Sequence, residues 1–511
     1  MPWWLVVLLV IAVALLLVAI HDVFQRKHAV LRNFPIVGHF RYLIEKIGPE
    51  LRQYVVADNE EERPFNRDQR RWIYATAKHQ NAYFGFGTDN DIGATGHVLF
   101  LHSTFPISGH EHAAGMELPC TKILGGWRDR PAKFRPSSVV NISAMSFGSL
   151  SGAAIEALNR GAALSGCLHN TGEGGVSPYH LQGGDLIVQI GTGYFGCRTV
   201  DGRFDIGHLL ETIEGRPVKA IEVKLSQGAK PGMGGLLPAP KVTAEIARIR
   251  GVPQGKDVAS PASHAEFDDV AGLIDFVELI ASETGLPVGI KSAVGQMPFW
   301  EELASQMAEQ NRGPDFIAVD GGEGGTGAGP LPFTDHVALP FWMGFSRVFA
   351  EFVNVGLHRD VVFVGSGKLG LPADAALALS VGVDLINVGR EAMLAAGCVQ
   401  AQKCHTGHCP TGVATQSKWL QRGLDPTSKG VRVANYVSGL RDELIRLSHA
   451  CGVCHPAILP GDAVNVADGS RGTLSAHEWF DIDVEATVLE PVVVKEVMEV
   501  MDPRPHVGHE N

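Results

Sequence analysis

The chain has 511 residues, of which 45% are hydrophobic and 19% charged, and this composition predicts one large folded domain or two ordinary ones. Its formal net charge of −12, with no basic stripe carrying interleaved aromatics, excludes nucleic acid as an expected partner. The 60 glycines gather in short runs such as GEGG and GGEGGTGAG rather than in a collagen or linker period, and such runs let a backbone approach a ligand closely.

The first predicted element is an uncharged apolar run from Trp3 to Ile20. As a helix it would span roughly 27 Å, just enough for a bilayer core. A signal peptide, the alternative, would want a basic start and a small-residue cleavage site, which this run lacks. The basic residues that follow it are Arg26, Lys27, Arg32 and Arg41. By the positive-inside rule we predict a single-pass anchor at residues 1–22, inserted in the inner (cytoplasmic) membrane through residues 3–20, with the body in the cytoplasm.

A polar, mixed stretch at residues 23–96 predicts juxtamembrane helices and loops. From about residue 135, short apolar strands alternate with helical stretches. Eight strands are expected, at residues 138–145, 167–172, 186–191, 220–226, 287–293, 316–322, 361–367 and 385–390. Eight such units predict an α/β fold of the (β/α)8 TIM-barrel type within residues 97–480, followed by a C-terminal tail at 481–511.

Polar residues follow many of these strands. They are Ser143, Asn170, Glu173, Gln189, Lys224, Gln227, Lys291 and Asp320. Because the C-terminal strand ends of a barrel meet at one rim, where active sites lie, we expect these side chains to come together. Lys224 and Lys291 follow apolar strand residues and should point inward, where a lysine needs an anion partner or a lowered pKa.

Glycines at 365, 367 and 370 give a G-x-G-x-x-G pattern between a strand and a helix. A dinucleotide site would need an acid at the end of the next strand, but Asp384 stands at its start. In a barrel the same glycines fit the phosphate-binding loops after strands seven and eight. Further parts of this phosphate cup would be Gly325, Gly327, Gly389 and Arg390. We therefore favour a mononucleotide phosphate over a dinucleotide.

Three cysteines, Cys398, Cys404 and Cys409, lie within one short segment that also holds His405 and His408. Zinc usually takes four ligands with a closely spaced Cys pair, which is missing here. Three thiolates suit an iron–sulfur cluster that lacks one iron corner. Spacing alone leaves iron–sulfur, zinc and free thiols open.

The other five cysteines carry weaker patterns. Cys451 and Cys454 run into His455 as C-x-x-C-H, a haem-attachment pattern that does not suit a cytoplasmic body, and the context of a thioredoxin-like motif is missing too, so this pair is either structural or unexplained. The remaining three, expected to be small buried hydrophobes, are Cys120, Cys167 and Cys197.

Together these motifs resemble the FMN-binding synthase domain of glutamate synthases. The resemblance runs from about Asn141 to Gln416. It rests on SAMSFGSLS (143–151), NTGEGG (170–175), KLSQGAKPGMGG (224–235), DGGEGGTGAGP (320–330) and CHTGHCPTGVATQ (404–416). The region from His21 to the low nineties is similar to that of stand-alone, membrane-anchored members of the superfamily.

The resemblance implies FMN and a [3Fe-4S] cluster as cofactors, with Cys398, Cys404 and Cys409 as cluster ligands. The residues it implies at 2-oxoglutarate and its imine are Glu173, Lys224 and Gln227. The residues it implies at the flavin are Ser143, Ala144, Met145, Ser146, Gln189 and Lys291, with Gly325, Gly327, Gly365, Gly367, Gly389 and Arg390 at the phosphate.

The implied activity is that of an FMN-dependent oxidoreductase acting on CH–NH2 donors, which reduces a 2-imino acid to a glutamate-type product. The electron donor is left open: it could be ferredoxin, a reductase (flavoprotein) subunit or the membrane quinone pool. We expect neither the glutaminase domain nor the β-helical domain of full glutamate synthases in this chain, so ammonia, another amine or a partner would supply nitrogen. Tyr194 stands where arginine is expected in the large enzymes, which leaves the substrate open. The alternatives are amine transfer resembling N-methylglutamate synthase and a non-catalytic flavin or redox-sensing scaffold.

Overall fold

The computed structural model describes residues 2–25, 29–81, 83, 85–107 and 117–501. It divides into two compact units, residues 1–71 and 72–511. The division falls inside the stretch predicted to be juxtamembrane, since residues 72–96 belong to the second unit. The predicted domain limits stay predictions.

The first unit is helical. α1 (Trp3–Phe24) is exposed almost throughout, and within the described residues it is the one helix long and apolar enough to cross a membrane. A signal sequence would meet the same criterion. The elements that follow are α2 (Ala29–Asn33), α3 (Gly38–Leu51), a π-helical turn (Arg52–Val56) and α4 (Arg67–Ala77), which crosses into the second unit.

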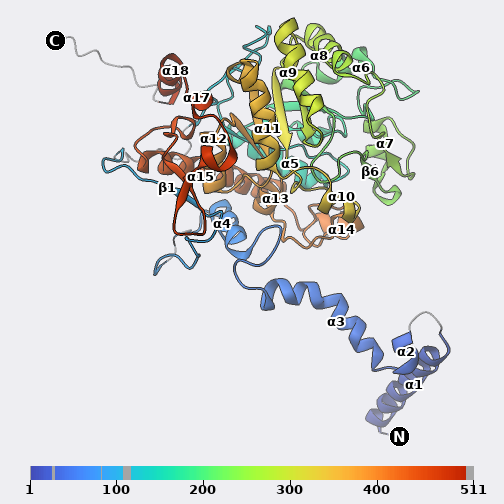
Figure 1. Ribbon diagram of the computed structural model, residues 1–511. Coiled ribbons are helices and arrows are strands. Elements are labelled where there is room, and N and C mark those ends of the chain that lie inside the picture. The colour runs from blue at the N-terminus through green and yellow to red at the C-terminus, as the bar shows by residue number, and fades with distance from the viewer. Residues whose placement is uncertain (1, 26–28, 82, 84, 108–116, 502–511) are drawn as a thin grey trace. The chain divides into compact units, whose positions relative to one another are not determined.

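In the second unit, the larger body of Figure 1, eight parallel strands close into a barrel. They are β2 (Val140–Ile142), β3 (His169–Asn170), β4 (Leu186–Ile190), β5 (Val218–Lys224), β8 (Val288–Ala293), β9 (Phe316–Asp320), β10 (Val362–Ser366) and β11 (Leu385–Val388). β11 pairs with β2 and completes the closure. All eight strands lie where the sequence placed them, so the predicted barrel is confirmed.

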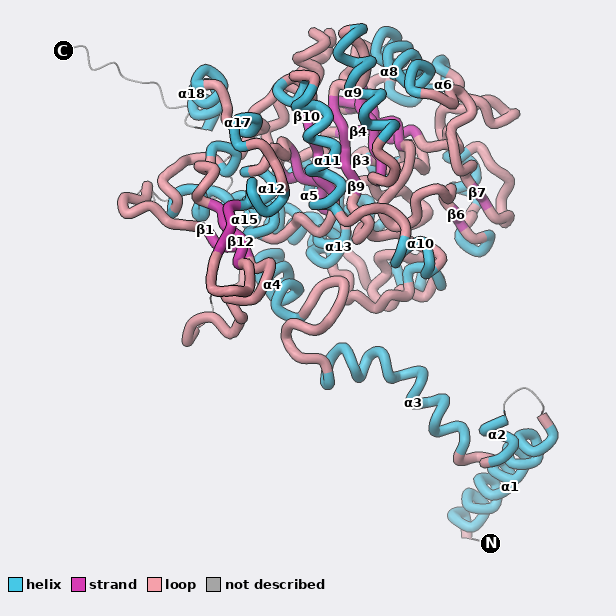
Figure 2. The backbone as a smooth tube through the Cα atoms, viewed as in Figure 1, coloured by secondary structure: helices cyan, strands magenta, loops and turns pink. Residues whose placement is uncertain are grey.

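Helices surround these strands (Figure 2). They are α5 (Gly152–Ser165), α6 (Ile206–Ile213), α7 (Ala244–Arg250), α8 (Val270–Thr284), α9 (Pro298–Gln310), α10 (Leu331–His336), α11 (Phe341–Asn354), α12 (Pro372–Ser380) and α13 (Arg390–Ala396). Local sequence sets their limits: Ser151 and Asp269 cap α5 and α8 through side-chain oxygens, and Gly166 and Gly285 end them in the left-handed conformation. A 3₁₀ turn, Pro178–His180, stands between β3 and β4.

Apolar side chains fill the barrel, among them Leu168, Phe316 and Val364. The segment before β2 closes the amino-terminal end of the barrel, where Leu124 joins this core. There Lys122 Nζ donates to the carbonyl oxygens of His358 and Val361 and to Asp384, at 2.7, 2.9 and 2.8 Å. This end of the barrel is therefore closed by apolar packing and by the Lys122–Asp384 ion pair.

The remaining elements flank the barrel. α15 (Pro426–Ala450) packs on α5, and its Asn435 donates to the Ala77 carbonyl of α4 at 3.0 Å. Two small antiparallel sheets consist of β1 (Val98–Phe100) with β12 (Val464–Ala467) and β13 (Thr473–Ser475), and of β6 (Leu236–Leu237) with β7 (Val258–Ala259). The short helices are α14 (Lys418–Gln421), α16 (Ala476–Phe480), α17 (Val484–Thr487) and α18 (Pro491–Met501). The predicted tail from residue 481 thus contains α17 and α18.

Candidate active site

The three predicted catalytic residues lie together on the rim. Lys224, the last residue of β5, places Nζ 3.3 Å from the carboxylate of Glu173, which follows β3. The same Nζ donates to Gln227 Oε1 at 3.0 Å, and Gln227 Nε2 donates to Thr326 Oγ1 at 3.1 Å. Since Thr326 follows β9, the ends of three strands supply one connected polar group.

Two glycines hold the Glu173 side chain in place. A Cβ atom at Gly191 would lie 2.5 Å from Glu173 Oε2, and one at Gly235 would lie 2.4 Å from Oε1. The carboxylate therefore rests against bare backbone on two sides. Any side chain at either position would collide with the carboxylate and force it to move.

Positive charge exceeds negative charge around this carboxylate. Burial acts to raise the pKa of Glu173, but Lys224, Arg250 and Lys230 outweigh it and hold that pKa below its ordinary value. Three cations beside one ionised carboxylate leave a net positive neighbourhood, which suits an anionic substrate group. The buried Lys230 donates to the Ala328 carbonyl at 2.7 Å.

Arg250 is a site residue that the sequence did not reveal. It ends α7 in the connection from β5 to β8, and the residue is 4% exposed. Nη2 donates to the Phe147 carbonyl at 3.1 Å and to Ser146 Oγ at 3.4 Å, while Nε is buried with no partner among the described residues. Burial lowers the pKa of Arg250 to about 10. The guanidinium thus supports the segment predicted to face the flavin.

Tyr194, the position where arginine was expected, is buried and supports Lys224 indirectly. Its hydroxyl accepts from the Ala265 N–H at 3.0 Å and lies 3.0 Å from His264 Nδ1, and His264 Nε2 lies 2.9 Å from the Lys224 carbonyl. Because a carbonyl only accepts, Nε2 carries the proton and Tyr194 donates to Nδ1. Burial lowers the pKa of His264, which favours this neutral form. Tyr194 therefore contributes position, not charge.

A second polar group lies deeper, between the barrel strands. Gln189 Nε2 and Asn170 Nδ2 both donate to Glu222 Oε1, at 2.6 and 2.8 Å. Lys291 Nζ is 3.5 Å from Asp320 Oδ2. Burial opposes the charge on Lys291, but Asp320, Glu222 and Glu173 raise its pKa, so it is a cation. Glu222 was missed by the sequence analysis, although its place two residues before Lys224 puts it on the same face of the strand.

The predicted flavin segment is the loop after β2, formed by Ser143, Ala144, Met145 and Ser146. The Ser143 N–H donates to the Val388 carbonyl at 2.9 Å, and the Met145 N–H to the Asn170 carbonyl at 3.3 Å. Gly172 has a φ of +66°, and a Cβ there would lie 2.7 Å from the Ser146 nitrogen. A glycine is thus required for the loops after β2 and β3 to touch.

Arg390 lies where the phosphate was predicted. Its Nη2 donates to the Glu323 carbonyl at 2.5 Å, and a Cβ at Gly325 would lie 2.7 Å from Arg390 Cδ. Burial lowers the pKa of Arg390. The residue joins the loops after β9 and β11 and offers a partly buried cation between them.

The other predicted phosphate glycines differ in whether packing requires a glycine at their position. A Cβ at Gly365 or Gly367 would lie 2.9 or 2.6 Å from the Phe341 side chain, so packing excludes larger residues there. At Gly327 and Gly389 the nearest atoms would be 3.9 and 3.6 Å away, an ordinary contact distance. Packing does not require a glycine at these two positions. With glycine there, no side chain covers the backbone.

The three predicted cluster ligands are free thiols in one neighbourhood. Burial raises the pKa of Cys398 to about 12, and the charges of Cys404 and Cys409 add to that rise. Within the part of the chain that the structure describes, no group of three or more His, Cys, Asp or Glu side chains is placed to hold a metal. The cluster therefore stays a prediction.

The segment that carries these thiols is held through its backbone. The Tyr74 hydroxyl donates to the Cys398 carbonyl at 2.7 Å, and Lys241 Nζ donates to the Cys404 carbonyl at 2.8 Å. His405 and His408 are exposed. Lys241 precedes α7, so the connection from β5 to β8 reaches both the rim and the cysteine segment.

The other cysteines lie apart from this chemistry. Cys120, Cys167 and Cys197 are buried, and burial raises the pKa of each thiol. His455 Nε2 is 3.0 Å from the Pro119 carbonyl, and its Nδ1 accepts from the Ala457 N–H at 3.1 Å. Both ring nitrogens of the C-x-x-C-H histidine are thus used inside the protein.

The chain is similar to known proteins over most of its length. The model of a family described as the conserved region in glutamate synthase matches residues 130–454. A glutamate synthase large subunit-like protein of Bacillus subtilis, YerD, is 37% identical over 484 residues, 88% of this chain and 92% of that protein. A glutamate synthase large subunit-like protein of Rhizobium meliloti is 30% identical over 78% of this chain and 90% of its own length.

Other similar proteins are more distant or less fully covered. An archaeal glutamate synthase (NADPH) of Methanocaldococcus jannaschii is 35% identical over 318 residues, and the match spans 61% of this chain and 59% of that protein. Among solved structures, a mutant flavocytochrome b2 with sulfite bound aligns over 95% of both chains at 15% identity, with a TM-score of 0.45.

Proposed function

Because this chain belongs to the family of the conserved region in glutamate synthase, we propose that it is an FMN-dependent oxidoreductase acting on amino-acid substrates. It reduces the imine formed from a 2-oxo dicarboxylic acid and ammonia or an amine, and the product is a glutamate-type amino acid. The observation that carries this proposal is the group of Glu173, Lys224 and Gln227, with its surplus of positive charge.

Each member of this group has a role that its position allows. Lys224 presents a cation that binds a substrate carboxylate, and its Nζ holds a proton beside the imine nitrogen. Glu173, fixed between Gly191 and Gly235, orients that Nζ from 3.3 Å. Gln227 limits the position of Nζ from the other side. Lys230 and Arg250 supply the positive charge that binds a second substrate carboxylate.

The residues at the rim fit FMN. Lys291 is a buried cation and Arg390 a partly buried one, and both suit an anionic group. The loop at Ser143–Ser146 and the glycines at 325 and 327 offer backbone to the ring and the phosphate. When bound there, FMN would supply hydride transfer to the imine carbon.

We further infer that Cys398, Cys404 and Cys409 hold a [3Fe-4S] cluster and that ferredoxin or a reductase subunit supplies electrons. Thiolates are the donors such clusters require, although the thiols are not placed as a ready-made site. We also infer that α1 anchors the protein in the inner membrane with its body in the cytoplasm, which the basic residues after α1 support.

The test uses full-length protein purified without oxygen, with its flavin reduced chemically. We expect 2-oxoglutarate with ammonia to reoxidise the flavin and to yield glutamate, detected by mass spectrometry. Lys224→Met should abolish this reaction while flavin stays bound. Lys219→Met is the matched control, since Lys219 is an exposed residue of the same strand.

Two results would contradict the proposal. Stoichiometric flavin that no 2-oxo acid and amine reoxidise would favour a redox scaffold. N-methylglutamate from methylamine and glutamate, without glutamate synthesis from ammonia, would favour the amine-transfer alternative.

A further inference from the structure

α3 carries an apolar face that no described part of its own unit covers. The exposed residues of this face are Phe40, Leu43, Ile44, Ile47 and Leu51. Their spacing of three and four residues places them on one side of the helix. On the other side Arg41 and Glu45 form an exposed ion pair at 3.0 Å. The helix is therefore amphipathic, with an apolar side and a charged side.

A buried carboxylate ties the start of α3 to the end of α1. Asp22 lies in the last turn of α1 and is the one residue of that helix whose side chain is buried. It accepts from the Ile36 N–H at 2.9 Å and lies 2.9 Å from His39 Nε2, in the first turn of α3. The start of α3 therefore lies beside the end of α1, which is the point where α1 would leave the bilayer.

The charge of this region differs from that of the chain as a whole. Residues 21–53 contain six Lys or Arg and three Asp or Glu, in a protein of formal net charge −12. A locally basic segment beside a membrane span is attracted to anionic headgroups. An amphipathic helix with basic residues lies in the plane of the interface, with its apolar face toward the acyl chains.

We propose that α3 is an interfacial membrane helix, and that its apolar face is covered by anionic lipid. At 1.5 Å per residue its length is about 21 Å along the membrane surface. The inference rests on the proposed anchoring by α1, and it adds a second, surface-lying contact of different chemistry. The occupant of the face is lipid rather than protein because Asp22 fixes the helix at the membrane exit and because the local charge complements anionic headgroups.

The experiment measures the depth of single sites in the full-length protein, reconstituted in vesicles of phosphatidylcholine and phosphatidylglycerol in equal amounts. A p-acetylphenylalanine that carries a nitroxide replaces Phe40 or, as the matched control, Glu45, which lies about 140° around the helix at ~100° per residue. A third label replaces Leu9 in α1. Collisions with oxygen and with a water-soluble nickel chelate are compared by EPR power saturation.

We expect the label at Phe40 to collide more often with oxygen than with nickel, as the label at Leu9 does, and the label at Glu45 to show the reverse. A label at Leu9 in water overturns both the anchoring and the inference. A buried label at Leu9 with equal depth at Phe40 and Glu45 overturns the inference alone. A label at Phe40 shielded from both reagents also overturns it, because protein, not lipid, then covers the face.

Discussion

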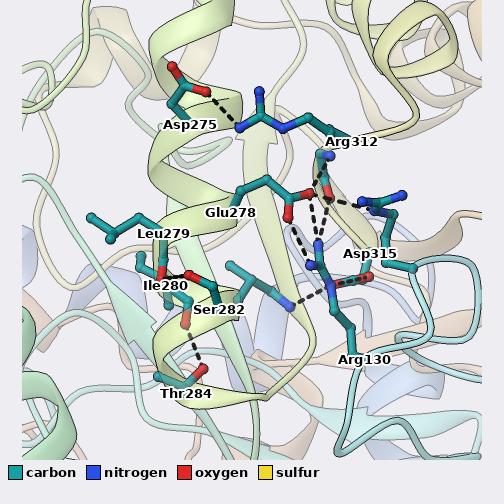
Figure 3. Close-up of polar contacts among 12 residues, drawn as sticks. Arg130, Asp275, Glu278, Leu279, Ile280, Ser282, Thr284, Arg312 and Asp315 are labelled. Carbon is teal, nitrogen blue, oxygen red and sulfur yellow. Dashed lines mark hydrogen bonds and ion pairs between the residues drawn. The ribbon is translucent and has the colours of Figure 1, made fainter.

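Arg130→Ala removes a cation enclosed at the amino-terminal end of the barrel (Figure 3). Arg130 Nε donates to both carboxylate oxygens of Asp315, at 3.1 and 3.0 Å, and its two terminal nitrogens donate to Glu278 at 2.9 and 3.0 Å. The side chains of Arg130 and Asp315 are 8% and 0% exposed. Removing one partner of such a buried pair costs about 3–5 kcal/mol, because the other charge stays buried without compensation.

The pH dependence of this cost follows from the Asp315 carboxyl. Burial raises its pKa to about 6 even with Arg130 beside it. A carboxyl group whose pKa is higher in the folded than in the unfolded protein stabilises the fold at pH values below its ordinary pKa of about 4. This stabilisation is lost as the pH rises toward 6. Without Arg130 that pKa rises further, so the loss extends to higher pH. The variant should therefore be most destabilised above about pH 7, and less so near pH 5.

The assay is urea unfolding followed by circular dichroism, at about pH 8 and about pH 5. Arg312→Ala is the control in the same region (Figure 3): its ion pair with Asp275 at 2.7 Å joins side chains that are 39% and 69% exposed. Exposed pairs contribute about 0–1 kcal/mol. Equal losses in the two variants, or an Arg130→Ala loss that does not shrink at low pH, would refute the reasoning.

Two further substitutions address the site. Gly191→Ala places a Cβ 2.5 Å from the Glu173 carboxylate and should lower the rate of flavin reoxidation about a hundredfold, because misplacing a catalytic group by an ångström can cost about that much. Gly295→Ala, at a rim position with no atom within 4 Å, should leave the rate unchanged, and equal rates in both variants would contradict this account. Cys404→Ser should reduce iron from about three atoms per chain to near zero while flavin stays bound. Cys197→Ser should keep the iron; iron retained in Cys404→Ser would remove that cysteine as a ligand.

The barrel could be predicted from the sequence because each strand is a short buried run that ends at polar residues. The meeting of Glu173, Lys224 and Gln227 followed from this, since parallel strand ends share a rim. The role of Tyr194 did not follow, because its hydroxyl is directed by His264 and Ala265, which lie far along the chain. The sequence indicated only that tyrosine stands at position 194 where a charged arginine was expected. The structure shows that Tyr194 supports Lys224 through His264.

Arg250 and Lys230 could not be found from local pattern. Both belong to the connection from β5 to β8, whose path over the rim is set by long-range contacts rather than by periodicity. Local pattern could not identify the role of Phe341 either. Its side chain packs where a Cβ at position 365 or 367 would lie, which explains the two glycines. Placing the three thiols as cluster ligands came from resemblance, and no contact in the structure tests it.

The connection from β5 to β8 also sets when the site can form during synthesis. Its hydrogen bonds to Asp320, Ala328, Phe147 and Cys404 join residues 92, 98, 103 and 163 positions apart. Contacts of such long range form only after the intervening chain has been made and closed. The connection therefore cannot complete these hydrogen bonds on a nascent chain that stops before Cys404. The candidate site and the cysteine segment thus share one connection, and that connection gains its full set of contacts only after the segment proposed to deliver electrons has been made.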